Sequence, residues 1–358
     1  MVQGEAAGVR LARPDVGADE LAAVAEVVES GQLTMGPKVA EFEAGLAAAC
    51  GTAHALSVSS GTAALHLAVL ALGIGPGDEV LVPAYTFPAT ANVVALAGAR
   101  PVLVDVDPVT MNIDPERAHA AVTPRTKAVM PVHLFGRPAR LEELPELPLL
   151  EDAAGALGAR RAGRHCGGLG AAGCLSFHPR KIVTTADGGA VTTDDDELAE
   201  RVRRLRNHGW RSLVPPDMPA PGFNLRLPDV LCALGIPQLA RLEQLLAARE
   251  RVAAGYAERL AGLPVTLPGA DDGDRHGWQA YVIQVERRDE VLAGLRARGV
   301  EAQIGTYAVH LLGAYRDQGE FPGARHAFET ALALPLHTRL TDAELDRVAE
   351  TLDSVVSK

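Results

Sequence analysis

The chain has 358 residues, of which 47% are hydrophobic and 22% charged, as in a globular protein with a large buried core. Its net charge of −11 speaks against general binding to nucleic acid or to an anionic membrane. The four cysteines form no Cys-x-x-Cys pair, so the sequence indicates neither a metal site nor a disulfide framework. Residues 1–5 lack a basic and an apolar signal region, and no run reaches transmembrane length, so we expect a cytoplasmic protein.

The first part of the chain alternates helical segments with short apolar runs. Apolar residues at helical spacing predict one helix over 17–30, ended by Gly31, and a second opened by Pro37. Later runs rich in Val and Leu, without period-two alternation, predict strands of a largely parallel sheet buried on both faces. These runs are 55–58, 79–82, 101–106, 128–132 and 147–150, with helix-like segments such as 62–72 and 89–97 between them. Repeated strand–helix–strand units imply an α/β sandwich.

The C-terminal part has a different pattern and predicts a second, smaller α/β domain. A long helix starts near Pro228, with a kink at Pro237, and ends at Gly262. The segments that follow are a strand over 278–285, a helix over 288–298, a strand over 331–336 and a helix over 341–356 with a Thr341–Glu344 capping box. We therefore expect a large domain at residues 1–240 and a small domain at residues 241–358.

A lysine on a constrained loop is the centre of the chemical interpretation. Lys181 lies between two apolar runs, 174–177 and 190–193, and Pro179 prevents the first run from continuing as a strand. An amine held there loses hydration, so it can act as a nucleophile and form a Schiff base. An ordinary surface lysine explains this stretch equally well, so the interpretation depends on the residues that accompany Lys181.

A carboxylate at the end of a predicted strand offers a partner for that lysine. The run 147–150 ends in Glu151 and Asp152, and the carboxyl ends of strands in an open α/β sheet face the ligand crevice. Asp152 could pair there with a protonated pyridine nitrogen and keep the ring an electron acceptor. Taken alone, an aspartate in this position is more often a helix N-cap.

Three loops offer further contacts. Residues 59–63 join a strand to a helix, where free N–H groups and hydroxyls either bind phosphate or simply cap the helix, and Ser176 adds a hydroxyl before Lys181. Tyr85 and Phe87 follow another strand, and one of them could stack on a flat ring, with core packing as the alternative. The segment 222–226 carries an amide and a guanidinium that could reach an anion, or it is a capped, solvated helix start.

Two other patterns point elsewhere. Gly168-x-Gly170-x-x-Gly173 matches the dinucleotide fingerprint of nicotinamide enzymes, but it follows a polar segment and leads into a predicted strand rather than a helix, so we set it aside. The arginines between residues 201 and 211 could suggest nucleic acid. In an acidic chain they are better explained as the solvated face of a helix, and some of them could lie near an anionic substrate.

Taken in order, these stretches resemble one family over nearly the whole chain, the DegT-type sugar aminotransferases. These are pyridoxal 5′-phosphate (PLP) enzymes with the aspartate aminotransferase fold, type I. The motifs that carry the similarity are Gly31-x-x-Thr34-x-Gly36-x-x-Val39-x-x-Phe42-Glu43, Ser60-Gly-Thr-Ala-Ala-Leu65, Gly77-Asp-Glu-Val80, Thr86-Phe-x-Ala-Thr90, Glu151-Asp-Ala-Ala154, Ser176-Phe-His-Pro-x-Lys181, Gly188-Gly189, Arg206-Asn-His-Gly209 and Gly222-x-Asn-x-Arg226.

The resemblance implies a fold and a set of roles. The fold has a large domain whose mixed, mostly parallel sheet is sandwiched by helices, plus a small C-terminal α/β domain. Lys181 would form the internal aldimine and shuttle the proton, and Asp152 would bind the pyridinium nitrogen. The other implied cofactor contacts are Gly61, Thr62, Ala63 and Ser176 to the phosphate, Phe87 to the ring, and Asn224 from the partner subunit of a homodimer with shared sites. The implied substrate contacts are Thr34, Tyr307 and His310.

Three departures from the family pattern affect the site. The family usually has Gln or His after Asp-Ala-Ala, near the cofactor hydroxyl, where this chain has Gly155 and leaves that contact to another group or to water. Ile182 stands where Asn commonly follows the lysine. A His-Tyr pair of the family is replaced by Gly305-Thr306, with Tyr307 shifted by one place, so the substrate assignment is the part most affected.

We expect a PLP-dependent aminotransferase that converts a nucleotide-linked keto sugar into an amino sugar, with glutamate or glutamine as amino donor. A cyclitol or another keto compound is the alternative substrate. Dehydratase relatives carry His in place of the lysine, so Lys181 favours transamination. A non-catalytic regulator and an NAD-binding protein are the remaining alternatives, which the Lys181–Asp152 pair disfavours.

Overall fold

The computed structural model describes residues 8–316 and 318–357, so the expectation drawn from residues 1–5 lies outside the described part of the chain. Two helices open the fold, α1 (Ala18–Ser30) and α2 (Pro37–Cys50), as predicted. Each ends at a glycine in the left-handed region, with φ of 72° at Gly31 and 66° at Gly51. Glycine adopts this conformation without steric cost, which explains where both helices stop.

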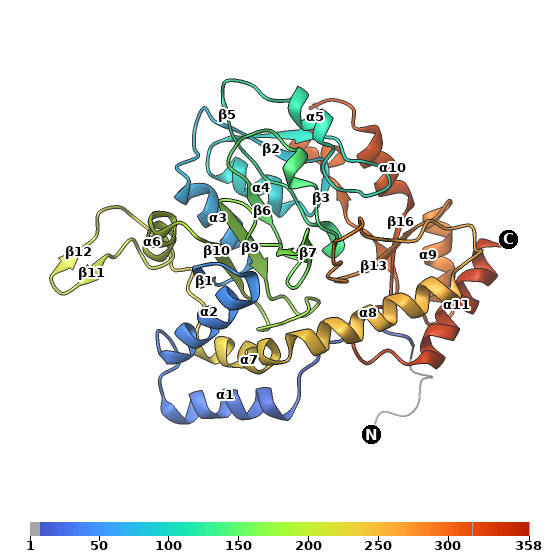
Figure 1. The fold of residues 1–358 in the computed structure, drawn as a ribbon, viewed down its shortest axis with the longest axis horizontal. Coiled ribbons are helices and arrows are strands. Elements are labelled where there is room, and N and C mark those ends of the chain that lie inside the picture. Colours follow the sequence, from blue (N-terminus) through green and yellow to red (C-terminus); the bar gives the residue numbers. More distant parts are fainter. Residues whose placement is uncertain (1–7, 317, 358) are drawn as a thin grey trace.

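A mixed sheet forms the centre of the molecule (Figure 1). Its strands are β4 (Arg100–Val104), β2 (Glu79–Pro83), β5 (Thr126–Val129), β6 (Leu150–Asp152), β9 (Ala172–Ser176), β10 (Gly189–Thr193) and β1 (His54–Val58), in that spatial order. Parallel bridges Val129–Leu149 and Val132–Asp152 join the β5 side to β6. Only β10 runs antiparallel to its neighbours, so the prediction of a largely parallel sheet is confirmed.

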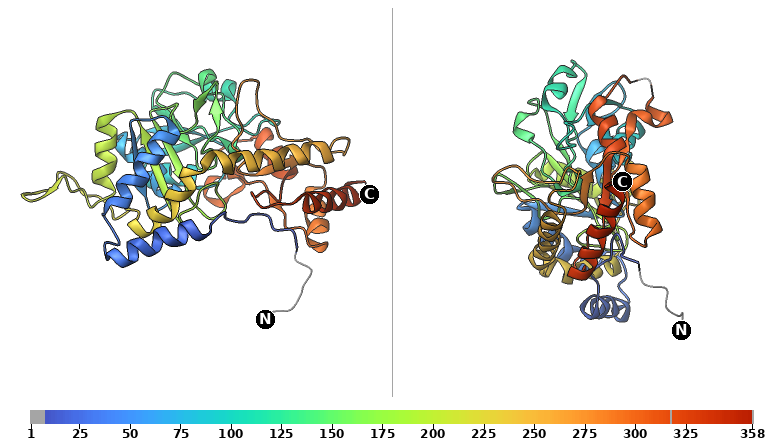
Figure 2. Two further views of the ribbon diagram at one scale, coloured as in Figure 1. Left: turned by 60° about the horizontal axis from the view of Figure 1, so that its bottom comes forward. Right: turned by 90° about the vertical axis from the view of Figure 1, so that its right-hand side faces the viewer.

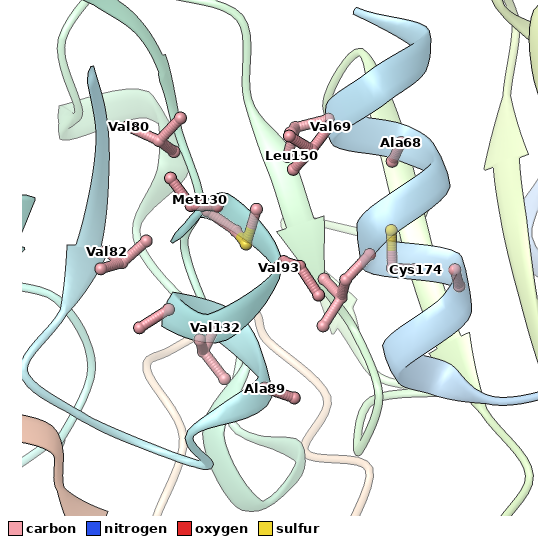
Figure 3. Packing of buried hydrophobic residues seen from close by; sticks show 14 of the residues in the cluster. Ala68, Val69, Val80, Val82, Ala89, Val93, Met130, Val132, Leu150 and Cys174 are labelled. Atoms are coloured by element: carbon pink, nitrogen blue, oxygen red, sulfur yellow. The ribbon is translucent and has the colours of Figure 1, made fainter. Parts of the chain in front are cut away.

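Helices cover both faces of this sheet, which explains the continuous apolar runs. Along β2, Val80 and Val82 pack with α3 (Gly61–Ala71) and α4 (Ala89–Leu96), whereas Leu81 packs on the other side with α5 (Pro115–Ala120). Figure 3 shows the first of these faces, where α3 and α4 meet side chains of the strands. The second face is also covered by α2 and α7 (Asp229–Ala240). Successive strand residues point to opposite faces, so both must be apolar.

The predicted kink in the long helix lies elsewhere. Pro237 lies inside α7, and the break comes at Arg241, which has φ of −113° and ψ of 23°. The guanidinium of Arg241 donates to Glu20 and to the carbonyl oxygen of Asp15, so contacts with the N-terminal segment hold the break at this residue. The next helix, α8 (Leu242–Arg259), is bent from α7 by 66°. In the described part of the chain no single helix is long and apolar enough to cross a membrane, and only this bent pair meets those criteria jointly.

The C-terminal part has its own core, built around Tyr256, Tyr281 and Leu295 and completed by Val9. Its elements are a sheet with the order β13 (Tyr281–Gln284), β16 (Ala331–Leu334) and β14 (Gln303–Ile304), and the helices α9 (Arg288–Ala297), α10 (Pro322–Thr330) and α11 (Asp342–Val356). The capping box of Thr341 and Glu344 is confirmed. The strand predicted over 278–285 starts only at Tyr281, because the backbone of residues 277–280 bonds to the loop around Gly136 instead.

Short elements connect these layers. They are β3 (Tyr85–Thr86) with β15 (Tyr307–Ala308), β7 (Arg160–Arg161) with β8 (Arg164–His165), β11 (Ser212–Leu213) with β12 (Pro216–Asp217), the helix α6 (Asp196–Leu205), and the 3₁₀ turns η1 (Leu134–Gly136), η2 (Leu141–Glu143), η3 (Val309–Leu311) and η4 (Gly313–Tyr315). The β11–β12 hairpin projects well away from the body of the molecule in two views (Figures 1 and 2).

Candidate active site

The loop that carries Lys181 connects β9 to β10 and is tied at several points. Phe177 N donates to Gly188 O at 2.8 Å, and Thr184 Oγ1 donates to Phe177 O at 2.8 Å. Gln238 of α7 accepts from Thr184 N at 2.9 Å and donates from Nε2 to Thr184 O at 2.8 Å. These bonds confirm the predicted constrained loop, because they close it on itself and fasten it to a neighbouring helix.

The amine of Lys181 has an altered pKa. Burial has the largest effect on the pKa of Lys181, the carboxylate of Asp152 opposes it and the positive charge of Arg180 adds to it, and together they lower this pKa to about 8. A lysine in water has a pKa near 10.4 and is almost wholly protonated at neutral pH. Lys181 therefore has a reactive neutral fraction near neutral pH, as a nucleophilic amine requires.

Asp152 lies at the carboxyl end of β6 and is only 5% exposed. Its Oδ2 accepts from Thr90 Oγ1 at 2.9 Å and its Oδ1 accepts from Ala154 N at 3.2 Å. Burial raises the pKa of Asp152, while both hydrogen bonds and the charge of Lys181 act against the rise. No helix follows Asp152, so the N-cap interpretation is wrong, and the carboxylate is held in one orientation at the sheet edge.

Glu151, the neighbour of Asp152, has a purely internal set of partners. It is fully buried and accepts from His133 Nε2 at 2.8 Å and from the N–H groups of Gly167, Leu169 and Gly170 at 2.7 Å each. Although burial alone would raise the pKa of Glu151, these donors lower it below its usual value. Glu151 therefore fixes the loop that precedes β9.

The same loop contains the glycines that match the dinucleotide fingerprint. A Cβ on Gly168 would lie 2.5 Å from the carbonyl oxygen of Cys50, and one on Gly173 would lie 2.3 Å from that of Gly167. The loop leads into β9 and not into a helix, and Glu151 already accepts from its N–H groups. Close backbone packing explains these glycines, so the structure favours setting the nicotinamide alternative aside.

The N-terminus of α3 forms a small cradle with the end of β9. Ser60 caps the helix by accepting from Ala63 N at 3.1 Å, whereas the N–H groups of Gly61 and Thr62 have no acceptor within the helix. A Cβ on Gly61 would lie 2.7 Å from the Cβ of Ser176, so glycine is what lets the helix approach this hydroxyl. The cradle provides two N–H groups and a hydroxyl for an anion such as phosphate, with Ala63 N used by the cap.

The two aromatic residues of the 83–90 loop lie in different environments. Tyr85 is fully buried, and its hydroxyl accepts from Thr306 N at 3.0 Å, so core packing explains its position. Phe87 is 61% exposed and lies edge-on to Tyr307, with 6.2 Å between the ring centroids. The pairing of β3 with β15 brings Tyr307 to this place. Phe87 is thus the aromatic residue that is free to contact a ligand ring.

Three other predicted site residues form no hydrogen bond, ion pair or ring contact with Lys181 or Asp152 within the described chain. Thr34 and Asn224 are exposed, the former in the loop between α1 and α2 and the latter bridged to Asn207. His310 is buried beside Phe321 on η3, and neither of its ring nitrogens has a partner among the described residues. Their predicted roles stay predictions.

Two residues that matter for the geometry were not predicted. Thr90 orients Asp152, and its signal was its place in the Thr86-Phe-x-Ala-Thr90 motif, at the second residue of α4. Gln279 is the side chain nearest to Gly155, with Cγ and Oε1 each 3.4 Å from the position of a Cβ there. No signal in the sequence links Gln279 to Gly155, because the two residues are far apart in the chain.

The arrangement fits PLP in chemical type. The cradle of Gly61, Thr62 and Ser176 suits the phosphate, the buried Asp152 suits a protonated ring nitrogen, and Lys181 offers an amine of lowered pKa for the aldehyde. Phe87 offers a ring face or edge beside them. No cluster of three or more potential metal ligands occurs among the described residues.

Comparisons with known proteins agree with this chemistry. A sequence model of the DegT/DnrJ/EryC1/StrS aminotransferase family matches residues 14–353. The chain is 39% identical to GDP-perosamine synthase of Caulobacter vibrioides over 364 residues, covering 97% of this chain and 98% of that protein.

Solved structures give the same result. The chain is similar to S. venezuelae DesV, crystallised with a ketimine intermediate, at 39% identity and a TM-score of 0.91, covering 95% of this chain and 94% of that one. It is also similar to Spr1654 of Streptococcus pneumoniae in its PMP form, at 29% identity and a TM-score of 0.94, covering 98% of each chain. Spr1654 has been solved in a PLP form as well.

Proposed function

The chain belongs to the DegT/DnrJ/EryC1/StrS aminotransferase family, and from this premise we propose that it transfers an amino group to a nucleotide-linked keto sugar, with PLP as cofactor. The names of its relatives support a sugar substrate, since one is GDP-perosamine synthase. Glutamate or glutamine is the proposed amino donor. The observation that carries the proposal is the pair of half-buried Lys181 and buried Asp152, each with a pKa shifted toward its neutral form by burial.

Each residue of the site has one task in this proposal. When bound, PLP supplies a ring that accepts the electrons of a breaking C–H bond. Asp152 holds the ring nitrogen, with Thr90 and Ala154 N fixing its two oxygens. Gly61, Thr62 and Ser176 hold the phosphate, and Phe87 lies against the ring. The geometry of the cradle and of the carboxyl end of β6 supports this division.

Lys181 has two tasks. Its amine would join the cofactor aldehyde, and the lowered pKa supports this task because only the neutral amine attacks a carbonyl. Once an amino donor had taken its place, Lys181 Nζ would be free to take a proton from one carbon and return it to another, in the half-reaction of the donor and in that of the keto acceptor. A general base works best when its pKa lies near the working pH, which a value of about 8 satisfies.

A homodimer with shared sites is part of the proposal. Large apolar side chains are exposed on the loop before α2, at the Phe87–Tyr307 pair, beside α3 and on the projecting hairpin; they are Leu33, Met35, Phe87, Leu213, Val214, Phe223 and Tyr307. Apolar surface of this kind is typical of an interface. A second copy of the chain would bring Asn224 toward the phosphate and Thr34 toward the substrate. Tyr307 and His310 remain proposed substrate contacts.

The cellular location and the division into domains complete the proposal. A cytoplasmic location is supported by the four cysteines, which are all buried and unpaired, as expected in a reducing compartment. A division into domains at 1–240 and 241–358 is supported by the helix break at Arg241 and by the separate core around Tyr256.

The test is a spectroscopic screen of the cofactor-loaded enzyme. The protein is first converted to its pyridoxamine form with glutamate or glutamine and is then offered nucleotide-linked keto sugars, free keto sugars and keto cyclitols. We expect recovery of the aldehyde-form absorbance with a nucleotide-linked keto sugar, at least about tenfold faster than with the free sugar, because remote contacts raise the rate. Recovery only with a cyclitol, or with no compound, would contradict the substrate assignment.

A pair of lysine variants tests the site itself. Lys181→Ala should bind PLP without the absorbance band of the bonded form and should lose turnover by at least about a thousandfold. Lys127→Ala, which changes an exposed lysine on β5, should keep both and is the matched control. Full turnover in Lys181→Ala would remove this lysine from the mechanism.

A further inference from the structure

A short segment of the C-terminal part docks against η1, in the loop between β5 and β6. Gly277 N donates to Gly136 O at 2.8 Å and Gln279 N donates to Phe135 O at 3.1 Å. A Cβ on Gly136, which has φ of 96°, would lie 2.9 Å from Trp278 N and 3.1 Å from Gly155 O. The backbone of Gln279 is therefore fixed to η1, which itself lies beside the carbonyl oxygen of Gly155 in the loop after Asp152.

A buried arginine fixes the same segment from its other side. Arg249 of α8 is 4% exposed and donates from Nη1 to the carbonyl oxygens of Trp278 at 3.0 Å and Gln279 at 3.3 Å. Burial lowers the pKa of Arg249 to about 10. Main-chain carbonyls of this segment thus accept hydrogen bonds from a buried cation, and leaving that cation without them would be energetically costly, so the segment has little freedom to move.

The side chain of Gln279 reaches from this fixed backbone to the lysine loop. Its Cγ and Oε1 fill the space beside Gly155, and its Nε2 donates to Arg180 O at 3.2 Å. The carbonyl of Arg180 belongs to the peptide bond that leads into Lys181. One amide group therefore touches the loop of Asp152 and the loop of Lys181 at the same time.

We propose that Gln279 is a positioning residue for Lys181, which holds the peptide bond before the lysine at a fixed distance from the Asp152 loop. It acts through the main chain and not on the cofactor. This inference rests on the proposed function, because it assumes that Lys181 is the reactive amine. A Cβ at Gly155 would already be in van der Waals contact with this amide, at 3.4 Å, so a longer side chain there would compete with it for the same space.

Gln303 offers a matched control within the same chain. Its Oε1 accepts from Arg180 Nη1 at 2.6 Å, so it too is a glutamine of the C-terminal part that holds Arg180. It holds the guanidinium, however, and not the peptide bond that leads into Lys181. If Gln279 acts by fixing the main chain, then replacing Gln303 should not reproduce the effect.

The experiment compares Gln279→Met with Gln303→Met. Methionine keeps the volume beside Gly155 but removes the N–H donor, so folding should be retained, which thermal unfolding of each apo-protein checks. The first readout is the pH dependence of PLP incorporation into apo-protein. The amine of Lys181 responds there to Asp152 and Arg180, and its charge also lowers the pKa of His178. The second readout is the rate of PLP loss from the loaded protein.

For Gln279→Met we expect a midpoint at higher pH than in the parent, because a looser loop hydrates the amine, and PLP loss about tenfold faster. Gln303→Met should stay within about twofold of the parent in both readouts. Unchanged values in Gln279→Met, or equal changes in both variants, would overturn the proposal. If the parent protein bonded no PLP at Lys181, the proposed function itself would fail, and this outcome is seen before any variant of Gln279 is made.

Discussion

Thr90 Oγ1 donates a hydrogen bond of 2.9 Å to Oδ2 of Asp152, and this bond joins the first turn of α4 to the end of β6. Thr90 Oγ1 also lies 3.0 Å from the hydroxyl of Thr86 and 3.1 Å from the carbonyl oxygen of Phe87. A hydroxyl has a single proton, and a charged acceptor makes the stronger bond, so the carboxylate receives it. The orientation of Asp152 therefore depends on α4.

The first prediction concerns this bond. Thr90→Val removes the donor and keeps the shape, so Asp152 keeps only Ala154 N as a hydrogen-bond donor and its pKa should rise further. A hydrogen bond to a charged group contributes about 1.5–3 kcal/mol, which corresponds to a loss of roughly 10- to 150-fold in kcat/KM. Thr90→Ser keeps the hydroxyl and should retain most of the activity. Equal kinetics for the Val and Ser variants would show that the bond does not act on the reaction.

The second prediction is a pH profile for cofactor incorporation. Only neutral Lys181 attacks the aldehyde, so the rate for apo-protein should rise with pH and level off above about 8. An ordinary lysine would keep rising to a pH near 10.4, and at pH 7 it would have on the order of a hundredfold less neutral amine. The measurement is the rate of absorbance change after mixing apo-protein with PLP across this range.

A variant of Asp152 tests in which direction the pH midpoint of PLP incorporation moves. The carboxylate raises the pKa of Lys181 against the effect of burial, so Asp152→Asn should move the midpoint of incorporation below about 8. A midpoint that moved upward, or that lay near 10.4 in the parent, would refute the assigned environment of the lysine.

The third prediction separates two adjacent carboxylates. Glu151→Gln should destabilise the fold by about 3 kcal/mol or more, because buried donors from His133 and the 167–170 loop lose a charged acceptor. The pKa of Glu151 is lowered in the folded state, so its contribution to stability is present above the unfolded-state pKa and is lost as pH falls through the folded value.

The stability contribution of Asp152 depends on pH in the opposite direction. Its pKa is raised in the folded state, so its charge destabilises the apo-protein above the unfolded-state pKa, and Asp152→Asn should unfold at the same or a higher temperature than the parent. Its turnover should nevertheless fall steeply, because an unprotonated ring is a weaker electron acceptor. Thermal unfolding of the apo-proteins and single-turnover rates decide both points. A large loss of stability in Asp152→Asn with turnover intact would reverse these roles.

Local patterns were sufficient to predict most of the fold. Val80, Leu81 and Val82 form a strand covered on both faces, and an unbroken apolar run is the direct consequence of that burial. The loop of Lys181 could be predicted for a similar reason, since proline and glycine act on their own stretch of chain. The position of Asp152 followed from the end of its strand.

Contacts between distant segments could not be predicted in this way. The helix breaks at Arg241 and not at Pro237, because Glu20 and Asp15, which precede it by more than two hundred residues, hold the guanidinium. The contact of Gln279 with Gly155 has a comparable origin. It depends on backbone hydrogen bonds to Phe135 that no residue spacing in the sequence predicts. Both depend on tertiary packing, which overrides local preference.

The last prediction tests whether Asn224 completes the site of a partner subunit. Lys181→Ala and Asn224→Ala should each be nearly inactive alone. After unfolding and refolding together, about half of the dimers are mixed, and each mixed dimer has one site with neither defect, so about a quarter of the parent activity should return.

The control mixes Lys181→Ala with Thr90→Val, whose altered residues both belong to one chain's own site, since Thr90 bonds to Asp152 of the same chain. No mixed dimer of that pair contains an intact site, so the activity of the mixture should not exceed the average activity of the two variants measured separately. Asn224 is exposed and lies in the segment that follows the β11–β12 hairpin in the chain, which makes a contribution across an interface geometrically reasonable. If the first mixture recovered no more activity than the control, Asn224 would serve its own chain or no site at all.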